Sequence, residues 1–240
     1  MTIDHPPASY HLPLRECFPN VWLASSAITM AIPLKLKITF SRNMVAVRGS
    51  DGWVLLNPVR LSESAEAELL AIAPFKHAVR LGGLHGRDDQ YYVDKFGVDF
   101  WGVSGVQKYP GPKFNHEVTE GGPFPIPGAQ VVIFKDAKLA ECVVCLPQHH
   151  LLVTCDSVQH YERDRLISML GKIVMRKFGF FTPCVIGPFW LKMATPPGGS
   201  MRADFERVLS LDFDNLISGH GTPKIGGAKE SLALNVARLP

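Results

Sequence analysis

The chain has 240 residues, of which 46% are hydrophobic and 20% charged, enough apolar material to bury a large core in one globular domain. Its net charge is only +3 and it contains no block of lysine or arginine, so a dedicated nucleic-acid binder is not expected. No apolar run reaches about 18 residues, so the sequence predicts no membrane-spanning helix.

The N-terminal segment and the cysteines indicate a reducing environment. Residues 1–14 lack the apolar stretch of a secretory signal. The five cysteines are an odd number, which favours free thiols and a cytoplasmic location. Cys142 and Cys145 have the spacing of a metal or redox pair, but they lie in an apolar run typical of a buried strand. Residues three apart on a strand face opposite sides, so we expect these two cysteines to be structural.

Apolar runs separated by turns predict hairpins and strand–helix–strand units. The runs at 44–48 and 53–56 flank Asp51-Gly52, a pattern typical of a β-hairpin. Ser62 precedes a series of good helix formers, which predicts a helix N-terminus. In chain order, further strands are expected at residues 21–23, 76–81, 99–103, 130–134, 141–146, 151–156 and 216–217, and further helices at 90–96, 162–193, 204–211 and 229–239.

Polar residues follow several of these predicted strands. His85 and Asp89 follow one strand, Asp156 ends a second, and His220 follows a third within Ser-Gly-His-Gly, where the flanking glycines allow a positive φ. Strand ends of this kind gather at one edge of an α/β sandwich. Imidazoles and carboxylates together suit a divalent ion such as zinc, manganese or iron. A lone histidine is more often structural, and the chain has nine histidines, so the spacing alone leaves both interpretations open.

The order of these four residues resembles that of the metallo-β-lactamase-like hydrolase superfamily. The family loop has the pattern His-x-His-x-Asp-His, and residues 85–90 (His-Gly-Arg-Asp-Asp-Gln) keep its first histidine and its aspartate. Arg87 and Gln90 stand where the second and third histidines would be, and Lys138 stands where a later family histidine would precede an apolar strand. The strand end at Asp156 and the stretch around His220 match the remaining family ligands.

This resemblance covers residues 20–238 and implies the fold. The expected architecture is a single α/β domain over residues 1–240, built as a four-layer αββα sandwich with the metal site at one edge of its two sheets. Residues 162–203 are expected to form a helical insertion that is apolar and basic.

The resemblance also implies a reduced metal site. Of the three histidines that hold one ion in two-metal relatives, only His85 remains. The ligands of the other ion are represented by Asp89, Asp156 and His220, and Gln90 is a poor replacement for the fourth. The implied site therefore holds at most one divalent ion through these three residues and His85, or none.

The family chemistry implies hydrolysis of an ester, thioester, lactone or phosphoester in a small-molecule substrate. Asp89 is the candidate base that orients the attacking water. Arg87, Lys138 and His160 are candidate substrate-binding residues. The charged groups of Arg87 and Lys138 either polarise a substrate oxygen or form ion pairs that preserve the fold without metal. The alternative is an inactive member whose cleft binds a small anionic ligand or a protein partner.

The segment from 165 to 203 is basic and apolar, and it contains no acidic residue. Such a composition predicts a helical cover on the sandwich, an apolar lid, or a surface that makes weak contact with an anionic membrane. Its basic residues are Arg165, Lys172, Arg176, Lys177, Lys192 and Arg202.

Overall fold

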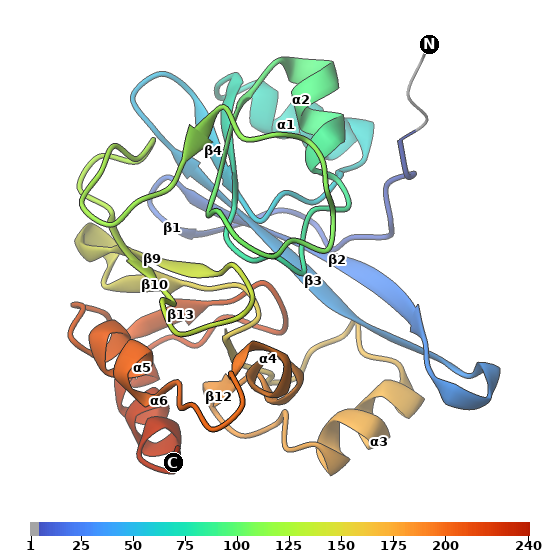
Figure 1. The fold of residues 1–240 in the computed structure, drawn as a ribbon. Coiled ribbons are helices and arrows are strands. Elements are labelled where there is room, and N and C mark those ends of the chain that lie inside the picture. The colour runs from blue at the N-terminus through green and yellow to red at the C-terminus, as the bar shows by residue number, and fades with distance from the viewer. Residues whose placement is uncertain (1–4) are drawn as a thin grey trace.

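The protein forms a four-layer αββα sandwich in a computed structural model that describes residues 5–240 (Figure 1). The first four residues, part of the segment expected to lack a signal, lie outside the described part. Two sheets pack face to face, and helices cover the outer face of each sheet. The predicted α/β sandwich is confirmed. Within residues 5–240, none of the helices combines the length and hydropathy needed to cross a bilayer.

The larger sheet contains, among residues 5–240, seven strands that lie side by side in chain order. The first four pair antiparallel and include the predicted hairpin at Asp51-Gly52, while from β4 onward the strands are parallel. Parallel neighbours need crossover connections: α1 lies in the one from β4 to β5 and α2 in the one from β5 to β6, whereas a loop joins β6 to β7. The strands are β1 (Arg15–Phe18), β2 (Val21–Ala31), β3 (Lys37–Arg48), β4 (Trp53–Leu56), β5 (Phe75–Arg80), β6 (Asp99–Gly102) and β7 (His116–Glu117).

The smaller sheet has the order β13-β10-β9-β8, with β10 parallel to β13 and the other pairs antiparallel. Cys142 on β9 packs between the two sheets, whereas Cys145 packs on the helical side, and both thiols are free. The expectation that they face opposite sides is confirmed. The strands are β8 (Gln130–Ile133), β9 (Cys142–Leu146), β10 (Leu151–Val153) and β13 (Asn215–Ile217), and a separate short pair joins β11 (Val158–Gln159) to β12 (Val185–Ile186).

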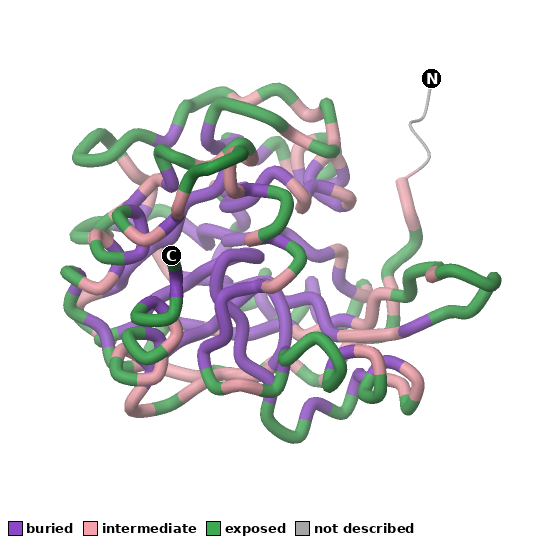
Figure 2. Tube along the Cα trace, turned by 60° about the horizontal axis from the view of Figure 1, so that its bottom comes forward, coloured by how far each residue is buried: buried purple, intermediate pink, exposed green. Residues whose placement is uncertain are grey.

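Alternation along the strands sorts side chains between the layers. Val54 and Leu56 pack between the sheets, while Trp53 and Leu55 pack against α1 (Glu63–Leu70) and α2 (Asp89–Phe96). The smaller sheet is covered in the same way by α4 (Pro188–Ala194), α5 (Arg202–Leu209) and α6 (Ala228–Val236). Figure 2 shows the buried stretches gathered inside this arrangement.

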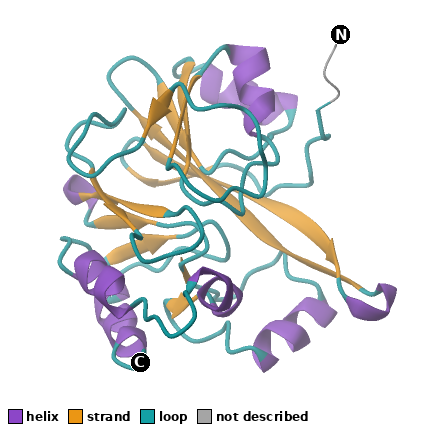
Figure 3. Cartoon of the chain, viewed as in Figure 1, coloured by secondary structure: helices purple, strands orange, loops and turns teal. Residues whose placement is uncertain are grey.

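The segment expected to be helical from 162 to 193 is interrupted. It contains α3 (Met169–Lys177) and α4, with β12 between them, because Gly179 takes a φ of +76° and Pro183 cannot continue a helix. Helix α3 lies beside the long β2–β3 hairpin (Figure 3), where the backbone N–H of Ser168 donates to the carbonyl of Thr39 at 3.0 Å.

Candidate metal centre

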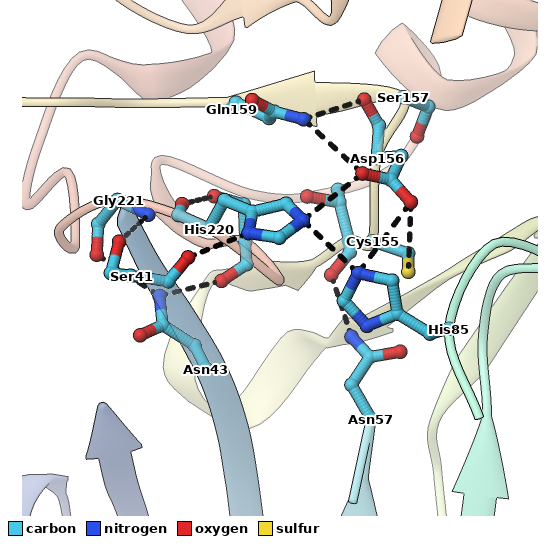
Figure 4. Close-up of polar contacts among 12 residues, drawn as sticks. Ser41, Asn43, Asn57, His85, Cys155, Asp156, Ser157, Gln159, His220 and Gly221 are labelled. Atoms are coloured by element: carbon cyan, nitrogen blue, oxygen red, sulfur yellow. Dashed lines mark hydrogen bonds and ion pairs between the residues drawn. The ribbon is translucent and has the colours of Figure 1, made fainter. Parts of the chain in front are cut away.

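Three side chains from separate strand ends converge at one edge of the two sheets (Figure 4). His85 follows β5, Asp156 follows β10 and His220 follows β13. Nε2 of His220 lies 3.1 Å from Oδ1 of Asp156 and 3.1 Å from Nε2 of His85. Nε2 of His85 lies 3.5 Å from Oδ2 of Asp156. The structure thus brings together three of the four residues that the sequence analysis proposes as metal ligands.

The imidazole of His220 is oriented by β3. Its Nδ1 lies 2.7 Å from the carbonyl oxygen of Ser41, and because a carbonyl only accepts, Nδ1 carries the proton. Nε2 of the same ring faces His85 and Asp156. The hydroxyl of Ser41 accepts from the backbone N–H of Gly221 at 2.7 Å, and Gly221 has the positive φ expected of it, +84°.

A polar triplet inside β3 supports the turn that carries His220. Ser41, Arg42 and Asn43 are all buried. Nδ2 of Asn43 donates to the carbonyls of Ser218 at 2.9 Å and Gly221 at 3.0 Å, which fixes the path of the turn. Outer contacts of this kind orient metal ligands. Our predictions missed the triplet, although three consecutive polar residues in an apolar strand were a visible signal.

A second buried carboxylate, Glu141, holds the loop that carries Asp156. Its Oε1 accepts from the backbone N–H groups of Asp156 at 3.0 Å and Ser157 at 2.5 Å. Burial and the charge of Asp156 raise the pKa of Glu141 well above its ordinary value. Burial would also raise the pKa of Asp156, but His85 and His220 beside it lower that pKa to about 2. Asp156 is therefore the ionised member of the pair.

His85 is neutral in this arrangement. Burial lowers its pKa to about 3 despite the nearby carboxylate of Asp156, and the positive charges of Arg42 and Lys108 act in the same direction as burial. The ring also needs room, which Gly219 provides, since a Cβ at that position would lie 3.1 Å from Cε1 of His85.

These three groups fit one divalent ion. Two imidazole nitrogens and one carboxylate are donors that zinc accepts readily. With bonds of about 2.0–2.1 Å, a tetrahedral ion separates its ligand atoms by about 3.3–3.4 Å, and the separations here are 3.1, 3.1 and 3.5 Å. Among residues 5–240, Glu141 and Cys155 form a second potential ligand group that shares Asp156, and Sγ of Cys155 lies 3.8 Å from Oδ2 of Asp156.

The three side chains line a cavity of about 490 Å³, a size typical of small-molecule sites. Arg42, Arg87 and Lys108 add three cations to its wall, and Asp156 is the only acid among the lining residues of the described chain. The remaining wall is largely apolar and comes from the β2–β3 hairpin, α3, α4 and the segment between the two helices. Prominent apolar members are Met30, Phe40, Val174, Phe180, Phe189 and Met193.

Comparison with solved structures identifies the fold to which this architecture belongs. No protein-family model and no curated protein matches the sequence. Solved structures do match, among them a metallo-β-lactamase from Erythrobacter litoralis, at 12% identity and a TM-score of 0.58 over 93% of this chain and 91% of that one. The metallo-β-lactamase FIM-1 from Pseudomonas aeruginosa, in a mono-zinc form, matches at 10% identity and a TM-score of 0.57 over 97% of both chains. VMB-1 matches at 14% identity and a TM-score of 0.62 over 96% of this chain and 99% of its own. The chain has the metallo-β-lactamase fold.

Within this metallo-β-lactamase fold, Asp89 is not brought to the three converging residues. Its Oδ2 accepts from Nε of Arg80 at 2.6 Å, and both side chains are buried. Burial raises the pKa of Asp89, and the guanidinium of Arg80 opposes that effect. Arg80 also donates to the carbonyls of Tyr109 at 2.9 Å and Gly111 at 2.7 Å, so the ion pair anchors the loop after β6. Gln90 likewise points elsewhere, since its Nε2 donates to Asp94 at 2.8 Å.

A second buried ion pair holds the loop between β5 and α2, which leads into Asp89. Arg42 of the β3 triplet donates to Oδ2 of Asp88, which also accepts from the backbone N–H of Arg60 at 3.0 Å. Two arginines from neighbouring parts of one sheet therefore neutralise the two consecutive aspartates of the loop. The cations predicted near this loop were Arg87 and Lys138, whereas Arg80 and Arg42 are the ones that pair with its aspartates.

The three candidate substrate-binding residues have different positions. Arg87 lines the cavity and lies 4.0 Å from Asp88. Lys138 is exposed and is not among the residues that line the cavity. His160 is buried outside the cavity, where its Nδ1 accepts from the backbone N–H of Cys184 at 3.5 Å.

Replacing Gly86 with alanine is expected to lower the free energy of unfolding by about 3 kcal/mol. Gly86 has a φ of +137°, and a Cβ there would lie 2.7 Å from Nη2 of Arg80, whose guanidinium is fixed by its ion pair. Gly97→Ala is the matched control, because Gly97 also has a positive φ, +62°, but no atom lies within 4 Å of its added Cβ. That control is expected to cost about 1 kcal/mol. Urea unfolding measures both, and equal losses would contradict the contact with Arg80.

Proposed function

We propose that this protein is a metal-dependent hydrolase with one divalent ion, held by His85, Asp156 and His220. The observation that carries the proposal is the spacing of their three ligand atoms, 3.1, 3.1 and 3.5 Å, at the wall of the cavity. A divalent ion bound there supplies a water whose pKa is lowered toward neutrality.

The residues of the chain then divide the remaining tasks. His85 and His220 would hold the ion through Nε2, while Nδ1 of His220 donates its proton to the carbonyl of Ser41. Asp156 is the only carboxylate of the described cavity wall, and its pKa of about 2 keeps it ionised, so it would serve as the anionic ligand of the ion. Asp89 is already engaged by Arg80.

The cavity also indicates the class of substrate. Arg42, Arg87 and Lys108 line the cavity together with Asp156, and Arg42 and Arg87 lie against Asp88, so cations exceed acids in the cavity wall. The apolar wall accepts a hydrocarbon or aromatic body. The best match is an ester or thioester that joins an apolar acyl group to an anionic group.

Metal analysis combined with an activity assay tests this proposal. Protein purified without chelator is expected to contain about one divalent ion per chain. We expect it to hydrolyse p-nitrophenyl esters of apolar acids, to lose that activity on treatment with a chelator, and to regain it on addition of zinc, manganese or iron(II). Absence of bound metal together with hydrolysis that is unchanged by chelator would contradict the proposal.

A second candidate function is binding without catalysis, and the position of Asp89 favours it. Because Arg80 occupies the carboxylate of Asp89, one residue of the family's usual set is absent from the site. In this case a fluorescent fatty acid would bind the cavity with equal affinity before and after chelation, and no ester would be cleaved.

A further inference from the structure

The opening of the cavity lies on a surface that is both apolar and basic. Met30, Phe189 and Met193 line the cavity and are also exposed, so the cavity opens where they lie. Three segments make up this surface: the tip of the β2–β3 hairpin, α3 with the residues that follow it as far as Phe181, and α4. Its other exposed apolar side chains are Leu34, Leu36, Met169, Ile173, Phe178 and Phe181. We call this surface the mouth face.

The three segments of the mouth face are connected. Ser168, the N-cap of α3, is hydrogen-bonded through its backbone N–H to Thr39 of the hairpin. At the other end of α3, the ring of Phe178 packs against Phe189 of α4 with a centroid distance of 4.9 Å. Figures 1 and 3 show the hairpin extending beyond the sheets toward α3, and Figure 2 shows its tip exposed.

Apolar side chains protrude from the mouth face. Leu34, at the tip of the hairpin, is 89% exposed, Met169 at the start of α3 is 74% exposed, and Ile173 one turn later is 65% exposed. Nine of the fifteen large apolar side chains that are exposed in residues 5–240 belong to this face. A concentration of this kind indicates an interaction surface.

Cations interleave with these apolar side chains. All six exposed lysines and arginines of the hairpin tip, α3 and α4 lack an ion pair with an acid in the described part of the chain. No acidic residue occurs between positions 165 and 203. The six cations are Lys35, Lys37, Lys172, Arg176, Lys177 and Lys192.

We propose that the mouth face docks on an anionic lipid membrane. Protruding apolar side chains enter the interfacial layer while the flanking lysines and arginines extend to the lipid headgroups. A second copy of the chain fits poorly, because a symmetric contact would bring twelve unpaired cations together. An acidic protein partner fits less well than lipid, since the apolar groups are separate protrusions on three segments.

Docking in this orientation directs the cavity toward the bilayer. An apolar chain with an anionic headgroup then passes from the lipid between Met30, Phe189 and Met193. The docking surface does not depend on the proposed hydrolysis, because none of its residues belongs to the group formed by His85, Asp156 and His220.

Vesicle flotation with the full chain tests the proposal. The protein is expected to float with vesicles that contain about 30% phosphatidylserine, and to remain at the bottom with pure phosphatidylcholine. Raising the salt from about 0.1 M to about 0.5 M is expected to weaken the association at least tenfold, because the lipid charge is then screened. No flotation with the anionic vesicles would overturn the proposal.

Matched variants locate the surface. Ile173→Asp and the pair Lys172→Glu with Lys177→Glu are each expected to weaken vesicle binding at least tenfold. Leu234→Asp on α6, at a leucine that is 63% exposed, and Lys76→Glu on β5 are the controls and should bind like the unaltered chain. Circular dichroism checks that all variants are folded. Equal binding by Ile173→Asp and the controls would overturn the proposal, as would a dimer in sedimentation velocity that Ile173→Asp dissociates while vesicle binding is absent.

Discussion

Replacing His220 with alanine is expected to lower the affinity for a divalent ion by roughly 100-fold or more. Nε2 of His220 lies 3.1 Å from Nε2 of His85 and 3.1 Å from Oδ1 of Asp156. Its removal takes away one of the three proposed donors, and two donors hold an ion much more weakly than three. When the metal concentration is too low to saturate the site, the rate of hydrolysis by the variant should fall in proportion to its metal content. A zinc titration in the presence of a competing chromophoric chelator, whose absorbance reports the free zinc, measures the affinity.

The control for this substitution is His160→Ala. His160 is also a buried histidine, 4% exposed, but it lies outside the cavity. Its replacement is expected to leave the metal affinity unchanged.

Asp89→Asn tests whether Asp89 is a metal ligand, as the family pattern implies, or only the partner of Arg80. The variant is expected to keep the metal because Asp89 pairs with Arg80. If Asp89→Asn loses metal as severely as His220→Ala, Asp89 is a ligand and the proposed three-residue site is wrong.

Replacing Arg80 with methionine is expected to lower the free energy of unfolding by about 3–5 kcal/mol. The side chains of Arg80 and Asp89 are 2% and 1% exposed, so the substitution leaves a buried carboxylate without its partner. It also removes the donors to the carbonyls of Tyr109 and Gly111. For a chain of this size the melting temperature should fall by roughly 10 °C.

A double-mutant cycle separates the ion pair from the general loss of packing. Arg80→Met combined with Asp89→Leu is expected to be more stable than Arg80→Met alone, because no unpaired charge then remains in the interior. Lys135→Met is a matched surface control: Lys135 pairs with Glu120 at 2.9 Å but is 63% exposed, and its loss should cost less than about 1 kcal/mol. Additive effects of the Arg80 and Asp89 substitutions would contradict direct coupling.

Local patterns determined much of the fold. The alternation of Trp53 to Leu56 across two faces, the Asp51-Gly52 turn and the opposite placement of Cys142 and Cys145 follow from the two-residue period of strands, which needs no knowledge of neighbours. The order of His85, Asp156 and His220 was likewise visible, because each follows an apolar strand and strand ends meet at one edge of a sandwich.

The partners of charged residues were decided only by the tertiary structure. Asp89 occupies the aspartate position of the family loop, and this position in the sequence is the same whether the side chain contacts an ion or an arginine. The difference comes from Arg80, nine residues earlier on β5, and from Gly86, which allows the loop to fold back onto that guanidinium. In the same way, Arg42 reaches Asp88 across 46 positions of the chain. Such pairs depend on which strands lie side by side and on where loops cross them.

The arrangement of the surface around the cavity was also decided by the tertiary structure. The composition of residues 165–203 indicated an apolar and basic segment, and the sequence left a cover, a lid and a membrane surface as alternatives. Only the packing of α3 beside the β2–β3 hairpin joined Leu34, Met169 and Ile173 into one face at the opening of the cavity. Periodicity specifies which face of an element is apolar, whereas the contacts between distant elements decide whether that face is covered or left to meet a partner.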